Sequence, residues 1–410
     1  MTYTISLTAT LLLASTLVGQ RAQDAGPYLA GWRSITFANP YAGSRSIPCM
    51  ITYPSKVAGK NTNLERRGAP YPVLVFGHGS GYIGDDYSAV ARHFASWGFL
   101  VVAPNTWASG PIVSLARDMQ ALTRIVRDEH TRSGSFLHGV VNVDKFGVAG
   151  HSMGGGASAE LLGSSSDVQA AVLLAPWTGD NSQPDPSEAM RRARVPFQVL
   201  VGSGDAVTPP TTNALPFYQK GAAVRGMRQM VTLWSACDHM AIVGMFLTSR
   251  WATESYDYAR RLMTAFMLAH LQDRDDMLQV LVGPGVHSQA RYDDVRYVVV
   301  DPNLYQTGTT KVGGSLDYHA MARANTVVLT YASLGPGSLP LPGLGTLGLD
   351  PTRIAHLSSL PTTARQTLHH SLPVPNLSSL AGLQVWIQSA AANEKNDYRL
   401  TPTRSFTILR

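Results

Sequence analysis

Hydrophobic and polar positions along residues 71–271 form short apolar runs separated by longer segments with helical periodicity. Runs that are apolar throughout must be buried on both faces, which is typical of parallel strands covered by helices. The expected strands are Pro72–Gly77, Gly98–Pro104, Lys145–Gly150, Ala170–Ala175, Phe197–Gly202 and Met230–Trp234. The expected helices are Tyr87–Ser96, Val113–Glu129, Gly154–Gly163, Asn213–Lys220 and Ser255–Leu271. Together with an antiparallel pair before them, Gly31–Phe37 and Ser46–Tyr53, they predict a doubly wound, mostly parallel α/β domain.

The pattern changes after Gly283-Pro284-Gly285, where strand-like runs follow one another without helices. These runs are Arg296–Val300, Thr326–Tyr331, Gly382–Gln388 and Ser405–Leu409, and a Gly/Pro/Leu-rich stretch fills residues 334–351. They predict a smaller C-terminal all-β domain, a sandwich or a partial barrel. We therefore expect an α/β domain over residues 26–287 and a β module over residues 288–410.

The first residues contain a short apolar run, Leu7–Val18, at the place where a secretory signal peptide has its apolar segment. No Lys or Arg precedes this run, so an ordinary N-terminal strand or helix is the alternative. We expect a signal peptide over residues 1–25 and a secreted protein, extracellular or periplasmic. Every apolar run is too short for a transmembrane helix.

The composition of the 410 residues narrows the possible classes. With 44% hydrophobic and 15% charged residues, the chain can bury a large core and is not a disordered protein. The net charge of +6 comes from scattered basic residues, so we expect no nucleic-acid partner. Cys49 and Cys237 could pair in an oxidising compartment or remain buried thiols.

Gly150-His151-Ser152-Met153-Gly154-Gly155 follows an expected strand and opens an expected helix. This is the context of a nucleophile elbow, a sharp turn in which glycines two residues before and after the serine prevent collisions. We expect Ser152 to be a nucleophile. Its neighbour His151 is expected to pack beneath the turn.

A serine nucleophile needs a histidine base and a carboxylate that orients it, in the chain order Ser, Asp, His. Asp205 follows the strand Phe197–Gly202, and His239 follows the strand Met230–Trp234, so both are expected at the same sheet edge as Ser152. Asp180, Asp185 and Asp238 are rival acids.

The tetrahedral intermediate of acyl transfer also needs backbone N–H donors. Met153, directly after the serine, is one expected donor, and Ser80 in the loop His78-Gly79-Ser80-Gly81-Tyr82 is the other, with Gly81 as an alternative. His78 is expected to brace this loop. No metal-ligand spacing or nucleotide-binding motif occurs, so we expect neither a metal nor a cofactor.

These motifs resemble the dienelactone-hydrolase-like α/β-hydrolases, and among them the secreted cutinase and poly(ethylene terephthalate) hydrolase branch. The resemblance covers roughly residues 30–285 and continues through a further series of motifs in order. They are Ala95–Val102, Ala175-Pro176-Trp177, Gly204-Asp205 with Thr208-Pro209, Ala214–Tyr218 and Asp238-His239. It implies an α/β-hydrolase fold, a triad of Ser152, Asp205 and His239, an oxyanion donor at Met153, and substrate contacts from Trp177 and Tyr82. His78-Gly79 is more similar to the platelet-activating-factor acetylhydrolase branch.

The expected function is that of a secreted serine hydrolase that cleaves carboxylic esters through an acyl-enzyme, with an ester partner that could be polymeric. A lipase or a phospholipid acetylhydrolase is the alternative within the same chemistry. A catalytically silent hydrolase fold that serves in binding or adhesion is the alternative from another class.

Overall fold

A computed structural model describes residues 21–41, 45–180, 182–287 and 291–410. Most of the expected signal peptide, residues 1–25, lies outside the described residues. Among the helices in the described ranges, none is both long and apolar enough to cross a membrane.

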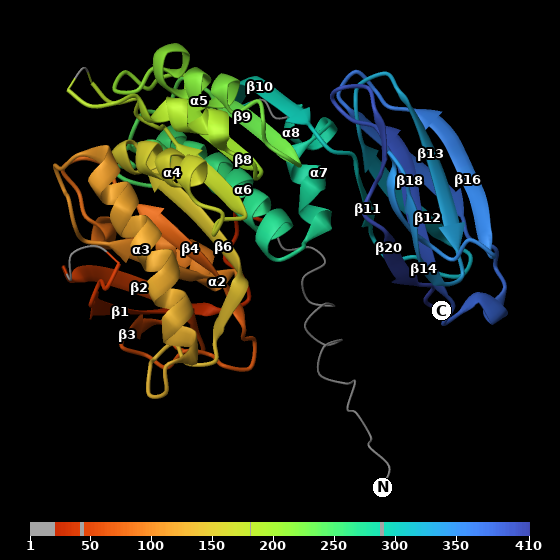
Figure 1. Cartoon of the computed structure of the whole chain (residues 1–410), viewed down its shortest axis with the longest axis horizontal. Coiled ribbons are helices and arrows are strands. Elements are labelled where there is room, and N and C mark those ends of the chain that lie inside the picture. The colour runs from red at the N-terminus through yellow and green to blue at the C-terminus, as the bar shows by residue number, and fades with distance from the viewer. Residues whose placement is uncertain (1–20, 42–44, 181, 288–290) are drawn as a thin grey trace, which may run out of the picture.

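One ten-stranded sheet organises the first part of the chain (Figure 1), and its strand order is β10-β9-β8-β7-β6-β4-β5-β2-β1-β3. The strands are β1 (Leu29–Phe37), β2 (Ile47–Ser55), β3 (Gly59–Lys60), β4 (Tyr71–Gly77), β5 (Leu100–Pro104), β6 (Val141–His151), β7 (Ala170–Leu174), β8 (Phe197–Gly202), β9 (Met227–Leu233) and β10 (Tyr292–Val299). Strands β4 to β9 pair in parallel, β2 is antiparallel to β1 and β5, and β10 is antiparallel to β9. The short edge strand β3 pairs in parallel with β1. This is the doubly wound, mostly parallel class that the sequence predicts.

Helices cover both faces of this sheet, because its strands are apolar on both sides. The helices are α2 (Ser88–Ser96), α3 (Ile112–Thr131), α4 (Met153–Ser164), α5 (Leu215–Lys220), α6 (Arg250–Leu271), α7 (Leu278–Leu281) and α8 (Pro284–His287). Short 3₁₀ turns are η1 (Gly84–Tyr87), η2 (Pro186–Arg192), η4 (Ala241–Val243) and η5 (Asp275–Met277), and η3 (Pro210–Ala214) is a π-helical turn.

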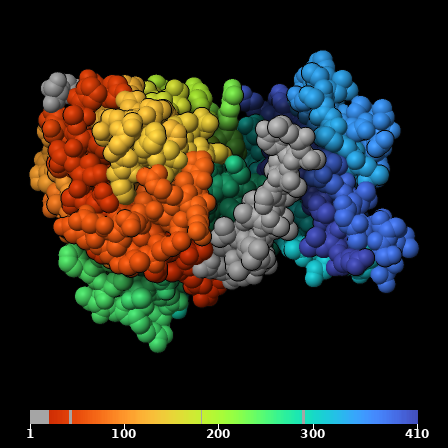
Figure 2. Space-filling view, turned by 90° about the horizontal axis from the view of Figure 1, so that it is seen from below, coloured from red at the N-terminus to blue at the C-terminus, as the bar shows by residue number. Residues whose placement is uncertain are grey.

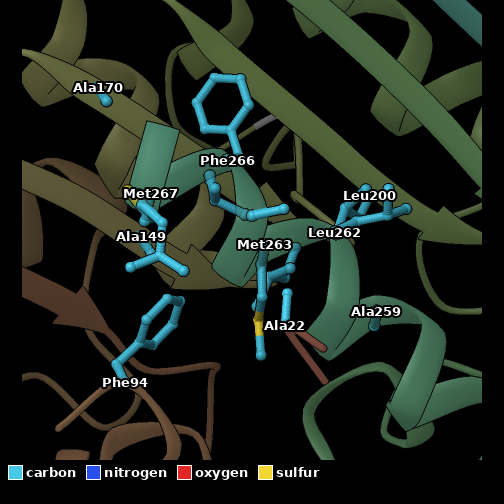
Figure 3. Packing of buried hydrophobic residues seen from close by; sticks show 14 of the residues in the cluster. Ala22, Phe94, Ala149, Ala170, Leu200, Ala259, Leu262, Met263, Phe266 and Met267 are labelled. Atoms are coloured by element: carbon cyan, nitrogen blue, oxygen red, sulfur yellow. The ribbon is translucent and has the colours of Figure 1, made fainter. Parts of the chain in front are cut away.

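Each face of the sheet has its own apolar core. Helices α3, α4 and α5 pack on one face and α2 and α6 on the other. Figure 3 shows the second core, in which Met263, Phe266 and Met267 of α6 lie near Ala149 of β6 and Phe94 of α2. Burial of such side chains contributes about 1.5–3 kcal/mol each, so the sheet is a rigid base for the loops at its edge.

The C-terminal module consists of strands only, apart from the 3₁₀ turn η6 (Ser378–Leu380). Its strands are β11 (Asn303–Thr307), β12 (Ser315–Met321), β13 (Val327–Ser333), β14 (Pro336–Leu341), β15 (Gly345–Leu349), β16 (Ile354–Pro361), β17 (Thr367–Pro373), β18 (Gln384–Ala392), β19 (Tyr398–Leu400) and β20 (Arg404–Thr407). The sheet β11-β12-β17 and the sheet of β16, β13, β18, β19 and β20 share one apolar core, and β14 and β15 form a hairpin. The all-β class expected after the α/β region is confirmed.

Two details differ from the sequence prediction. The apolar run Arg296–Val300, expected in the C-terminal module, belongs to β10 and extends the large sheet, where Val299 pairs with Met227. A continuous apolar run is compatible with a strand in either sheet, so the sequence pattern alone could not decide between the large sheet and the C-terminal module. The Gly/Pro/Leu-rich stretch at residues 334–351, to which the sequence pattern assigned no element, forms the β14–β15 hairpin.

The module lies beside the α/β region (Figure 2) and is joined to it by polar contacts. Arg404 of β20 donates to Asp275 at 3.0 Å, and Arg228 of β9 lies 3.4 Å from Glu394. The Tyr297 hydroxyl of β10 donates to the Arg365 carbonyl of the module.

Candidate active site

Ser152 occupies a strained turn between β6 and α4. Its backbone has φ 54° and ψ −116°, a region that residues with a side chain rarely adopt. The turn is possible because a Cβ at Gly150 would lie 2.2 Å from the Gly154 carbonyl oxygen, and a Cβ at Gly154 would lie 2.1 Å from the Gly77 carbonyl oxygen. Both positions therefore require glycine, as expected for a nucleophile elbow.

Asp205 and His239 meet at the same edge of the sheet, where β8 and β9 end. The Nδ1 atom of His239 lies 2.8 Å from Oδ2 of Asp205, and both side chains are buried. An imidazole held at Nδ1 by a carboxylate has its Nε2 atom available as a proton acceptor. The two residues predicted from separate strands are thus brought together.

Thr208 fixes the carboxylate of Asp205. Its hydroxyl donates to Oδ2 at 2.8 Å, and the N–H groups of Val207 and Thr208 donate to Oδ1 at 2.9 and 2.8 Å. Burial raises the pKa of Asp205, but the hydrogen bonds from His239 and Thr208 outweigh it and hold the pKa below its ordinary value. Asp205 is therefore ionised at neutral pH.

The backbone N–H groups of Met153 and Ser80 have no hydrogen-bond acceptor among the described residues. The N–H of Gly81, the alternative donor, already donates to the Ala108 carbonyl at 2.5 Å. A Cβ built at Gly79 would lie 3.5 Å from Cβ of Ser152, so the loop that carries Ser80 lies against the serine. Two unpaired donors beside a serine have the form of an oxyanion hole, and the start of α4 adds its positive helix end.

A hydrogen-bonded chain that the sequence did not reveal connects this loop to the His239 loop. The Gly79 N–H donates to the Tyr87 hydroxyl at 2.9 Å, and this hydroxyl lies 2.8 Å from Nδ1 of His151. The other ring nitrogen of His151 lies 2.7 Å from the His239 carbonyl oxygen. Burial lowers the pKa of His151 to about 3, so the neutral ring accepts from Tyr87 and donates to the carbonyl.

His78 braces the same loop, since its ring nitrogens lie 3.0 and 2.7 Å from the carbonyl oxygens of Gly79 and Thr106. Trp177 is half-buried, and its backbone N–H donates to the Ser152 carbonyl at 3.0 Å. Tyr82 is also half-buried and packs edge-on against Tyr87, with ring centroids 6.3 Å apart. Both predicted substrate-contact residues therefore lie next to the elements that hold Ser152.

The rival acids have other partners. Asp180 accepts from Ser182, Asp185 accepts from Lys220, and Asp238 accepts from the N–H groups of Met240 and Ala241. None of the hydrogen bonds of the described residues joins one of these carboxylates to His239.

Cys49 and Cys237 are buried free thiols that belong to the cores on opposite faces of the sheet. Within the described residues, no group of three His, Cys, Asp or Glu side chains could hold a metal ion.

Comparison with known proteins gives two family matches. Residues 79–254 match the family described as PET hydrolase-like, and residues 28–121 match platelet-activating factor acetylhydrolase, isoform II. The first match spans the Ser80 loop, the elbow, Asp205 and His239.

Among curated proteins, bis(hydroxyethyl) terephthalate hydrolase of Streptomyces coelicolor is 34% identical over 126 residues, which are 30% of this chain and 36% of that protein. Cutinase 2 of Thermobifida cellulosilytica is 31% identical over 143 residues, which are 34% of this chain and 50% of that protein. Cutinase cut1 of Thermobifida fusca is 31% identical over 143 residues, or 41% of its length. The matches thus span between about a third and half of these relatives.

Proposed function

We propose that the chain is a serine hydrolase of carboxylic esters, because residues 79–254 match the PET hydrolase-like family and the curated relatives are a terephthalate ester hydrolase and cutinases. The observation that carries the proposal is the 2.8 Å contact between His239 Nδ1 and Asp205 Oδ2 at the sheet edge where Ser152 occupies a strained turn.

In the first half-reaction the Ser152 Oγ attacks the ester carbonyl carbon while His239 Nε2 accepts its proton. The carbonyl oxygen becomes an oxyanion that accepts hydrogen bonds from the N–H groups of Met153 and Ser80. Collapse of this intermediate breaks the ester bond, and the imidazolium returns the proton to the leaving alcohol. Asp205 holds the ring orientation and stabilises the imidazolium without taking the proton.

In the second half-reaction a water molecule replaces the alcohol. His239 accepts a proton from the water, the hydroxide oxygen attacks the acyl carbon, and the carboxylic acid leaves as Ser152 regains its proton. Trp177 and Tyr82 are proposed to contact the acyl part of the substrate, since they flank the turn and the oxyanion loop. The proposal includes polyester substrates, as for cutinases, and export by a signal peptide over residues 1–25.

A second candidate substrate class is the acetyl ester of a phospholipid. The match of residues 28–121 to platelet-activating factor acetylhydrolase, together with the buried His78-Gly79 loop, favours it. Initial rates on a short aliphatic p-nitrophenyl ester, an aromatic diester, a polyester film and a short-acyl phospholipid separate the two classes.

The test of the chemistry is Ser152→Ala, with Ser164→Ala at the solvent-exposed end of the same helix as the matched control. We expect Ser152→Ala to lower kcat on p-nitrophenyl butyrate by at least about a thousandfold. A fluorophosphonate probe should label the wild type and Ser164→Ala but not Ser152→Ala. Wild-type turnover by Ser152→Ala would refute the mechanism, and an unlabelled, inactive wild type would favour a silent binding protein.

A further inference from the structure

A cavity lies between the α/β region and the C-terminal module, away from Ser152. It has a volume of about 660 Å³ and is bounded by the α7–α8 segment on one side and by β11, β12 and β17 on the other. This volume is in the usual range of small-molecule sites. The two sites lie near different parts of β10. His239 follows the end of β9 that pairs with Tyr292, the first residue of β10. The cavity is lined by Arg365, whose carbonyl accepts a hydrogen bond from Tyr297, further along β10. The triad residues do not line it.

One wall of this cavity is a stack of three aromatic rings on neighbouring strands. The rings of Tyr305 and His319 are 4.8 Å apart and 5° from parallel, and those of His319 and His369 are 4.4 Å apart and 14° from parallel. Both separations are close to the strand spacing, so the stack runs across the strands and the ring edges point away from the sheet. Aromatic edges carry partial positive charge and favour the face of another flat ring.

Tyr305 provides a polar group at the base of this wall. The residue is only 2% exposed, and its hydroxyl has no hydrogen-bond partner among the described residues. This hydroxyl is not fully enclosed by protein atoms, so we infer that it opens into the cavity that Tyr305 lines. An unpaired hydroxyl in a buried residue favours a ligand that carries a hydrogen-bond acceptor.

Arg365 is the one permanently charged side chain among the residues that line the cavity. Arg365 lines it with no carboxylate partner among the ion pairs of the described residues, and no Asp or Glu is among the lining residues. His369 lies 3.5 Å from Asp317 on the solvent side, and His319 lies 3.0 Å from the Thr307 hydroxyl. The lining therefore favours an anion over a neutral or cationic ligand.

The α7–α8 side of the lining contributes the apolar side chains of Val282 and Pro284, together with Gln279. Taken together, these walls fit a flat ring that carries a negative charge and an oxygen acceptor at its edge. We propose that this cavity is a binding site for a monocyclic aromatic carboxylate. The ring lies between the aromatic edges and the α7–α8 side of the lining, and the carboxylate accepts hydrogen bonds from Tyr305 and Arg365. The site does not depend on the proposed hydrolysis.

Titration calorimetry on the full chain tests the ligand class with three probes. Benzoate should bind with one site per chain, while cyclohexanecarboxylate, which is not flat, and benzamide, which is neutral, should each bind at least about tenfold more weakly. Absence of benzoate binding at millimolar concentration overturns the proposal, and so does cyclohexanecarboxylate or benzamide that binds as tightly as benzoate.

Three variants locate the site. Arg365→Gln should weaken benzoate binding about tenfold and Tyr305→Phe about threefold, as expected for the loss of a charged and a neutral hydrogen bond. Arg353→Gln, an exposed arginine of the same module that pairs with Asp350, is the matched control and should retain the wild-type affinity. Benzoate that binds elsewhere, including the Ser152 site, would be insensitive to Arg365→Gln, and equal affinities in Arg365→Gln and Arg353→Gln overturn the assignment. The same titrations in Ser152→Ala keep this result separate from the fate of the esterase proposal.

Discussion

The α/β region and the C-terminal module bury polar side chains in different ways. In the α/β region the buried polar side chains include six Asp or His residues, namely His78, His93, Asp118, His151, Asp205 and His239. In the described part of the module no Asp, Glu, His, Lys or Arg is buried. Its buried polar side chains are Thr, Ser and Gln, and Thr330, for example, pairs across strands with Ser389 at 2.8 Å.

The difference shows where each region stores unfavourable free energy. A cross-strand hydroxyl pair fits the regular ladder and costs little, whereas a positive-φ serine and buried ionisable groups cost about 1–3 kcal/mol each unless the surroundings hold them. In the α/β region Ser152 and four of these six residues, His78, His151, Asp205 and His239, lie at one sheet edge, where β4, β6, β8 and β9 end. We therefore expect substitutions there to change catalysis as well as stability, and comparable substitutions elsewhere to change stability alone.

The largest expected effect is that of Asp205→Asn. The neutral amide does not stabilise the imidazolium, and its NH2 group favours the tautomer of His239 in which Nδ1 accepts and Nε2 carries the proton, so kcat should fall by about ten thousandfold. Asp180→Asn, which replaces an exposed carboxylate in a loop, is the control and should keep wild-type kcat. Steady-state hydrolysis of p-nitrophenyl butyrate measures both, and an Asp205→Asn enzyme within tenfold of wild type would remove Asp205 from the triad.

Gly150, which is tightly packed in the elbow, allows the stability of the two regions to be compared. In Gly150→Ala the new Cβ would lie 2.2 Å from the backbone oxygen of Gly154, and relief of that overlap should cost about 3 kcal/mol. In the module, a Cβ at Gly335 meets nothing closer than 3.5 Å, so Gly335→Ala should change stability by less than about 1 kcal/mol. Urea unfolding measures both, and equal midpoints would show that the elbow is not tightly packed.

The sequence predicts the α/β region better than the module, for a physical reason. Strands such as β4 and β8 are apolar on both faces and stand out in any window, whereas β12, with Asp317 and His319 among its residues, alternates because one face is exposed. The triad positions follow from strand ends and chain order. Thr208 as a partner of Asp205 and the link through Tyr87 depend on contacts between distant segments, and no local pattern indicates them.

A variant at Tyr87 tests whether the hydrogen bonds that link the Ser80 loop to the His239 loop position the reacting groups. Tyr87→Phe leaves the Gly79 N–H and His151 Nδ1 without their shared partner, so kcat should fall about tenfold with little change in KM. Tyr53→Phe is the matched control, because it also removes a buried hydroxyl, which donates to the Thr62 carbonyl at 2.6 Å. An equal loss of kcat in both variants would mean that Tyr87 contributes only stability.

The smallest expected effect concerns acid stability and uses His93, whose Nε2 atom lies 2.8 Å from the Thr264 hydroxyl. Burial lowers its pKa to about 3 in the folded state, from an unfolded value of about 6.5. Between these pH values the unfolded chain binds a proton at His93 that the folded chain does not bind. The contribution of His93 to the free energy of unfolding is therefore fully present above about pH 6.5 and is lost as the pH falls towards 3. Glutamine does not titrate, so the free energy of unfolding of His93→Gln should fall by about 1 kcal/mol less than that of the wild type between about pH 7 and pH 5.5. Urea midpoints at the two pH values measure this, with His356→Gln on the exposed face of the module as control. A wild-type pH slope in His93→Gln would show that His93 does not contribute to the acid sensitivity of the α/β region.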